Sequence, residues 1–152
     1  MTPNEIRSRV VSFANSVAGL SAAPATYDRY VALIAPAETV SVQRSMSTVS
    51  SCGLAVAGIW RAAGYYGAAL NAPYVIGSAI SRLISLAHSL RAWTDFPATP
   101  GAAFPSPGDM VFLGGQYEHV YTVVSITTDG PTRPFTASMA ARGWACTKAS
   151  QA

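Results

Sequence analysis

Charged residues are scarce in this chain of 152 residues, since only 11% are Asp, Glu, Lys or Arg, whereas half are hydrophobic. This composition excludes the disordered class, because disordered chains combine low hydrophobicity with high charge. The length suits a single domain with one core over residues 1–152. The formal net charge of +3 is scattered along the chain without a basic run. Nucleic acid is therefore not an expected partner.

The chain also lacks long hydrophobic runs, metal-binding spacings and a cysteine framework. Arg82 interrupts the apolar stretch 74–90 well short of the length that spans a bilayer, so we expect no transmembrane segment. The cysteines and histidines lie far apart in sequence, with no paired zinc-type spacing: Cys52, His88, His119 and Cys146. We therefore expect neither a metal nor a cofactor. One Cys52–Cys146 bridge stays open as a possibility, but two cysteines exclude a disulfide-rich scaffold.

The N-terminal pattern predicts a helix over residues 3–17. Thr2 is a suitable N-cap, Pro3 occupies the first helical position and Glu5 completes a capping box. A signal peptide cleaved near SAAPA is the alternative, but polar residues break its apolar segment. We therefore expect a protein that is cytoplasmic until it is released or exported by a non-classical route.

Helical patterns come first along the chain and β-rich patterns come last. Helices are expected over 27–34, 52–63 and 76–93, and strands over 110–115, 119–128 and 134–139. A Pro/Gly-rich loop, residues 96–109, separates the two halves. This order favours an α+β fold in which N-terminal helices pack on a small C-terminal antiparallel sheet.

Cys52 follows Ser50 and Ser51 and opens the predicted helix 52–63. Backbone N–H groups and the helix dipole stabilise a thiolate at such a position. A nucleophilic thiol also needs a base, and His119 lies in the strand-like run 119–128. A cysteine at a helix start, packed beside a strand histidine, is the geometry of a papain-like site. The alternatives are a buried core thiol for Cys52 and a structural role for His119.

Three segments occur in a specific order: SCGLAVAGIWRAAG at 51–64, PSPGDMVFLGG at 105–115 and EHVYTVVSI at 118–126. Together they resemble the CHAP and NlpC/P60 group of papain-like cell-wall amidases and peptidases. The resemblance covers most of residues 45–128. It implies a papain-like fold, Cys52 as the nucleophile, His119 as the general base and amide bonds of bacterial peptidoglycan as the substrate.

The sequence departs from this family where a polar residue should orient the histidine. If Asp129-Gly130 forms a two-residue turn, His119 pairs with Ala140, which cannot orient an imidazole. Ser138 is the nearest substitute on the same face. The site is then a dyad, or it uses Ser138 or a water, or it is impaired.

Three functions therefore stay open. The first is a cysteine hydrolase that cleaves amide bonds of peptidoglycan, as an amidase or an endopeptidase. The second is a non-catalytic member of the same fold that binds wall fragments or a protein partner. A transglutaminase or a general cysteine protease is the third.

Other polar residues near the proposed site have more modest expected roles. Gln43 is a candidate side-chain donor to an oxyanion, beside the backbone N–H of Cys52. Asp109 is expected to cap the turn before a strand rather than to act in chemistry. Tyr65, Tyr66 and Tyr74 serve packing or line a groove, and we assign no chemistry to His88.

Overall fold

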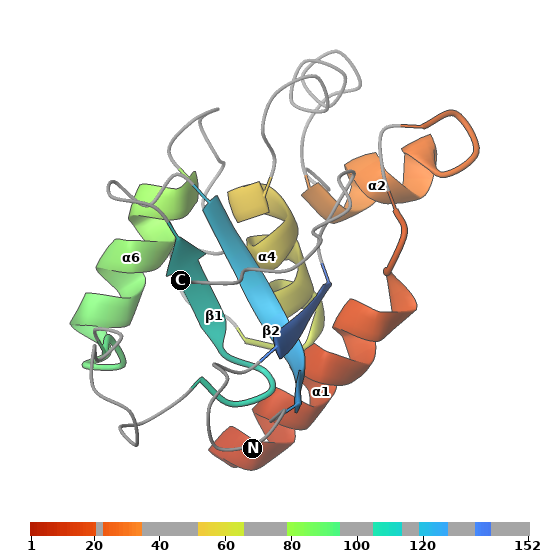
Figure 1. Cartoon of the computed structure of the whole chain (residues 1–152). Coiled ribbons are helices and arrows are strands. Elements are labelled where there is room, and N and C mark those ends of the chain that lie inside the picture. Colours follow the sequence, from red (N-terminus) through yellow and green to blue (C-terminus); the bar gives the residue numbers. More distant parts are fainter. Residues whose placement is uncertain are drawn as a thin grey trace.

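The computed structural model describes residues 1–20, 23–34, 52–65, 79–94, 105–113, 119–127 and 136–140. Four helices and three strands lie within these ranges: α1 (Pro3–Ser16), α2 (Tyr27–Ile34), α4 (Cys52–Ala62), α6 (Ala79–Ser89), β1 (Met110–Leu113), β2 (His119–Thr127) and β3 (Thr136–Ala140). The helices precede the strands along the chain (Figure 1). This order confirms the predicted α+β class.

The sheet has three strands in the order β1-β2-β3, and both pairs are antiparallel. The central strand, β2, pairs with β1 in an uninterrupted register from Leu113↔His119 to Met110↔Thr122. Its pairing with β3 is interrupted by an irregularity between Val123 and Ser125. The predicted antiparallel C-terminal sheet is therefore confirmed.

Helix α4 is the central element of the helical layer. It contacts β2 and each of the other three described helices, and Figure 1 shows it behind β2, between α6 and α1. Residues 52–59 are all buried. A helix that is apolar on every side is stable only when it is surrounded by other elements. The position of α4 explains why its sequence carries no charge before Arg61.

Helix α1 begins at the predicted capping box. The Thr2 hydroxyl accepts from the Glu5 N–H at 3.3 Å, and the Thr2 N–H donates to Glu5 Oε2 at 2.6 Å. These two bonds satisfy N–H groups that have no partner inside the helix. Val10 and Ala14 are fully buried and pack with Ile59 of α4. The prediction for residues 3–17 is confirmed to within one residue.

Helix α6 is shorter than the predicted 76–93. It ends at Ser89, and Arg91 then adopts a φ of 54° in the left-handed region, which no α-helix can contain. Leu90 in this turn is exposed, while Leu83 in the preceding helix is buried in the core. Among the described residues, no helix combines the length and the apolar character that a membrane span requires.

Candidate functional site

Cys52 is the first residue of α4 and carries a free thiol. Its side chain is 9% exposed and belongs to the main core cluster. No acidic residue lies in the first turn of α4, so the partial positive charge of the helix N-terminus is not cancelled locally. The position of Cys52 at the start of a helix is as predicted, while the Cys52–Cys146 bridge stays an untested alternative. Cys146, Ser50 and Ser51 lie outside the described residues.

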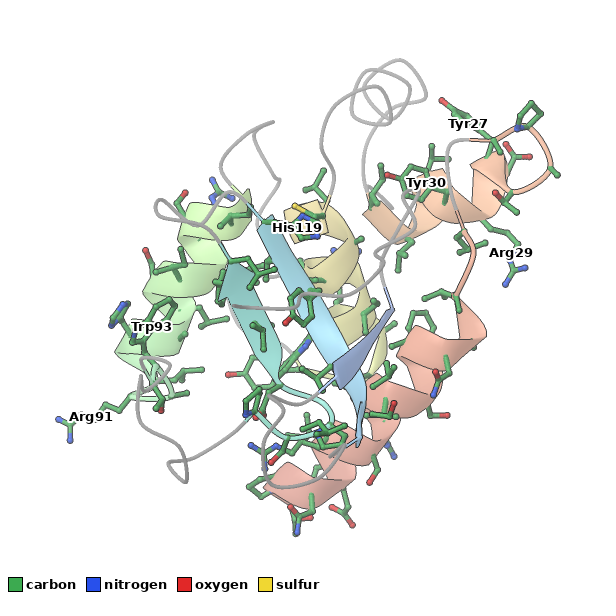
Figure 2. All side chains as sticks on the ribbon, viewed as in Figure 1. Tyr27, Arg29, Tyr30, Arg91, Trp93 and His119 are labelled. Carbon is green, nitrogen blue, oxygen red and sulfur yellow. The ribbon has the colours of Figure 1, made fainter. Side chains whose placement is uncertain are left out.

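His119 is the first residue of β2, at the same end of the molecule as the start of α4. Figure 1 shows that β2 and α4 both begin at the upper end of the view, and Figure 2 shows His119 there. The core cluster joins the two elements at this end, because Cys52 and Val120 both belong to it. His119 is therefore the sequence neighbour of Val120, which packs in the same cluster as Cys52. Cys52 and His119 themselves are 67 positions apart in the chain.

The pleat of β2 determines how His119 can approach the thiol. Val120 belongs to the cluster that contains Cys52, and Phe112, its partner on β1, packs against the same cluster. Because successive side chains alternate across a strand, the Cβ of His119 starts on the other face. An imidazole that reaches the sulfur must therefore pass around the end of β2, not across the buried face.

Tyr30 of α2 is a site residue that the sequence did not single out. It is 8% exposed and lies in the same core cluster as Cys52. Burial raises the pKa of Tyr30, and the electrostatic interaction with Cys52 raises it further. The phenol therefore stays protonated at neutral pH and can donate a hydrogen bond. Figure 2 shows Tyr30 on α2, at the upper end of the molecule where α4 begins.

The predicted partners of His119 on the neighbouring strand are wrong. Ala140 pairs with Thr122 instead of His119, and Ser138 pairs with Ser125. Ser125 is six residues from His119 along β2, so the Ser138 position lies roughly 20 Å from His119. The pairing of Thr127 with Thr136 differs from the register that a two-residue turn at 129–130 predicts, and residues 128–135 lie outside the described residues. Gln43, the predicted oxyanion donor, lies outside the described residues.

Asp109 has the structural role that was predicted for it. Its Oδ2 accepts from the Ser106 N–H at 2.8 Å, which closes the turn before β1. Its Oδ1 accepts from Arg7 Nη2 at 2.8 Å, and this ion pair joins α1 to the turn. Gly108 has a φ of 93° and lies so close to α1 that an added Cβ would be 2.9 Å from the Cβ of Arg7. The Pro-Gly-Asp motif therefore fixes α1 against the sheet.

The remaining predicted residues have packing roles or lie elsewhere. Tyr65 packs edge-on against Trp60, with ring centroids 5.4 Å apart, which supports the packing interpretation. His88 stacks on Trp93 at 4.7 Å, at the end of α6. Tyr66 and Tyr74 lie outside the described residues. Within the described ranges, no group of three or more His, Cys, Asp or Glu side chains could hold a metal ion.

Comparisons with known proteins add no relative to this picture. A scan of family models, a search of curated proteins and a search of solved structures each found no match.

Proposed function

We propose that this protein is a papain-like cysteine hydrolase that cleaves amide bonds of bacterial peptidoglycan. The observation that carries the proposal is the arrangement of Cys52 and His119. A free thiol begins a buried helix, and that helix packs against the strand that His119 begins. A thiol and an imidazole are the pair that thiol-dependent amide hydrolysis needs. The substrate class rests on the resemblance of the three ordered segments to cell-wall amidases and peptidases.

The proposed reaction has two stages. His119 accepts the thiol proton of Cys52, and the sulfur attacks the amide carbonyl carbon. The C–N bond breaks, the His119 imidazolium protonates the leaving amine, and a thioester remains on Cys52. His119 then takes a proton from water, and the resulting hydroxide attacks the thioester carbonyl. The acid leaves and the thiol of Cys52 is restored.

The oxyanion of each tetrahedral intermediate needs hydrogen-bond donors, and we assign one of them to Tyr30. Its phenol is buried in the cluster that contains Cys52, and it remains protonated at neutral pH. A buried O–H donor stabilises negative charge more strongly than a solvated one, because the local dielectric constant is low. The backbone N–H of Cys52 is the second proposed donor. Removing one donor of this kind slows such reactions about 100- to 1,000-fold.

Purified peptidoglycan tests the proposal. It is incubated with the wild type, Cys52→Ala, His119→Ala and the double variant, and the soluble fragments are identified by mass. We expect either single substitution to abolish fragment release, and the double variant to lose little more, because a nucleophile and its base act as a unit. His88→Ala is the matched control, since it removes the other histidine from the far end of α6. Wild-type and His88→Ala proteins should release the same fragments.

The non-catalytic alternative makes the opposite prediction. A wall-binding module sediments with peptidoglycan but releases nothing, and Cys52→Ala leaves that binding unchanged. Thiol chemistry provides an independent readout, because a thiolate paired with an imidazolium alkylates quickly at mildly acidic pH. We expect iodoacetamide to label Cys52 before Cys146 near pH 6, and more slowly in His119→Ala. Equal labelling of both cysteines would contradict an activated thiol.

A further inference from the structure

A hollow lies between α1, α2 and α4, away from Cys52. Its volume is about 400 Å³, within the range of small-molecule sites. Gly58, Arg61 and Ala62, in the C-terminal half of α4, form part of its wall. Arg61 is nine residues from Cys52, or roughly 13 Å along the helix axis. The hollow is therefore separate from the site proposed above, and binding in it does not depend on the hydrolase activity.

The wall of this hollow is mostly apolar, and the charged side chains that line it are all positive. Phe13, Val17, Leu20 and Leu33 supply most of the apolar surface. Ser16 also lines the hollow, but its hydroxyl donates to the Phe13 carbonyl at 2.7 Å, so that donor is already used. No Asp or Glu is among the lining residues. An apolar wall with few polar groups favours a ligand whose body is hydrocarbon.

Arg29 and Arg61 provide the positive charge, and they differ in the hydrogen bonds that their side chains make within the protein. Arg61 Nη2 donates to the Leu33 carbonyl at 3.1 Å, near the end of α2. Arg29 is exposed, and its side chain has no hydrogen bond or ion pair with any residue in the part of the chain that the structure describes. Figure 2 shows its side chain extending outward from α2. A guanidinium at the rim of an apolar hollow matches a carboxylate at the end of a hydrocarbon chain.

We propose that the hollow binds an aliphatic carboxylate of medium chain length. The hydrocarbon lies along the apolar wall of α1, α2 and α4, and the carboxylate pairs with Arg29 at the rim. Each methylene that enters the hollow strengthens binding about fourfold, until the volume is filled. A neutral chain of the same length loses the ion pair, so it binds about fivefold more weakly.

Titration of the ¹⁵N-labelled full chain with sodium hexanoate, octanoate and 1-octanol, followed by NMR, tests this proposal. We expect saturable shifts in α1, α2 and the C-terminal half of α4, with octanoate binding more tightly than hexanoate or octanol. Arg29→Gln should reduce octanoate affinity about fivefold to the level of octanol. Arg91→Gln is the matched control, since it removes the same charge from the opposite side of the molecule (Figure 2). It should leave the affinity unchanged.

A second variant tests the position of the hydrocarbon without changing any charge. Ala62→Met extends a side chain from an exposed position of α4 into the hollow, and Met is a good helix former. We expect it to abolish octanoate binding while the spectrum stays folded. Equal affinities for octanoate and octanol, equal effects of Arg29→Gln and Arg91→Gln, unchanged binding by Ala62→Met, or no binding at all would each overturn the proposal.

Discussion

Gly58→Ala offers a sharp test of the packing of α4, because two physical effects predict opposite results. Within a helix, replacing Gly by Ala normally stabilises the protein by about 1 kcal/mol. At Gly58, however, an added Cβ would overlap the Leu33 carbonyl oxygen and would lie 2.9 Å from Leu33 Cδ1. The obstruction is backbone, so it cannot rotate away. Helices α2 and α4 would have to separate.

The expected magnitude depends on the interactions that this separation disturbs. Overpacking a core costs about 1–3 kcal/mol. The Leu33 carbonyl also accepts the hydrogen bond from Arg61 Nη2, and a hydrogen bond to a charged group contributes about 1.5–3 kcal/mol. Partial loss of both outweighs the gain in helix propensity. We expect a net destabilisation of about 2 kcal/mol, which lowers the melting temperature by roughly 4–8 °C in a domain of this size.

Urea unfolding of the wild type and Gly58→Ala at equal m-values measures this change. Gly19→Ala is the matched control, because Gly19 has a φ of 82° but nothing lies within 4 Å of an added Cβ. It should cost only the left-handed strain of about 1–2 kcal/mol. The double variant Gly58→Ala/Leu33→Ala should regain little stability relative to Gly58→Ala, since the backbone carbonyl of residue 33 remains. If Gly58→Ala is as stable as the wild type or more stable, the close approach of α2 and α4 is wrong.

Three further predictions concern charge. A double-mutant cycle on Arg7 and Asp109, read by urea unfolding, should give a coupling of about 0.5–1 kcal/mol that falls at high salt, and no coupling would exclude the clamp between α1 and the turn. The Thr2 backbone N–H, then its hydroxyl, lowers the pKa of Glu5 below its ordinary 4.5. The contribution of the ionised Glu5 carboxylate to stability is therefore complete above pH 4.5 and is lost as the pH falls through the lowered pKa. In Glu5→Gln, the melting temperature should no longer show this decrease at acidic pH. Burial and then Cys52 raise the pKa of Tyr30 above 10. The contribution of the neutral Tyr30 phenol to stability is therefore complete below pH 10 and declines as the pH rises through the raised pKa. Tyr30→Phe should abolish that decline.

The elements of this fold were predictable from sequence where local signals dominate. The capping box of Thr2 and Glu5 and the apolar stripe behind it defined α1 to within one residue. The start of α4 at Cys52 was also correct. These features depend on neighbours three or four residues apart, whose interactions are the same in any fold.

The surroundings of the candidate site were not predictable in the same way. Tyr30 lies in a short helix whose pattern gives no sign that it packs against the start of α4. The β2–β3 pairing places Thr136 opposite Thr127, four positions from the partner that a turn at 129–130 predicts, and it is irregular between Val123 and Ser125. No local propensity reports either feature. Sequence therefore predicted that Cys52 begins a helix and that His119 begins a strand, but it assigned the wrong strand neighbours to His119.

A core cysteine and a nucleophilic cysteine differ in what Cys52→Ala does to stability. If Cys52 only fills space, removing a 9% exposed sulfur leaves a cavity that costs about 1 kcal/mol. If the sulfur is ionised beside the buried Tyr30 phenol, Ala also removes the desolvation penalty of that charge, so stability stays unchanged or rises. Val56→Ala calibrates the comparison, since Val56 is fully buried one turn along the same helix and its truncation should cost about 2 kcal/mol. Urea unfolding of the three proteins at pH 7 separates the cases, and a cost for Cys52→Ala of about half that of Val56→Ala would assign Cys52 to the core and remove the basis for its role as a nucleophile.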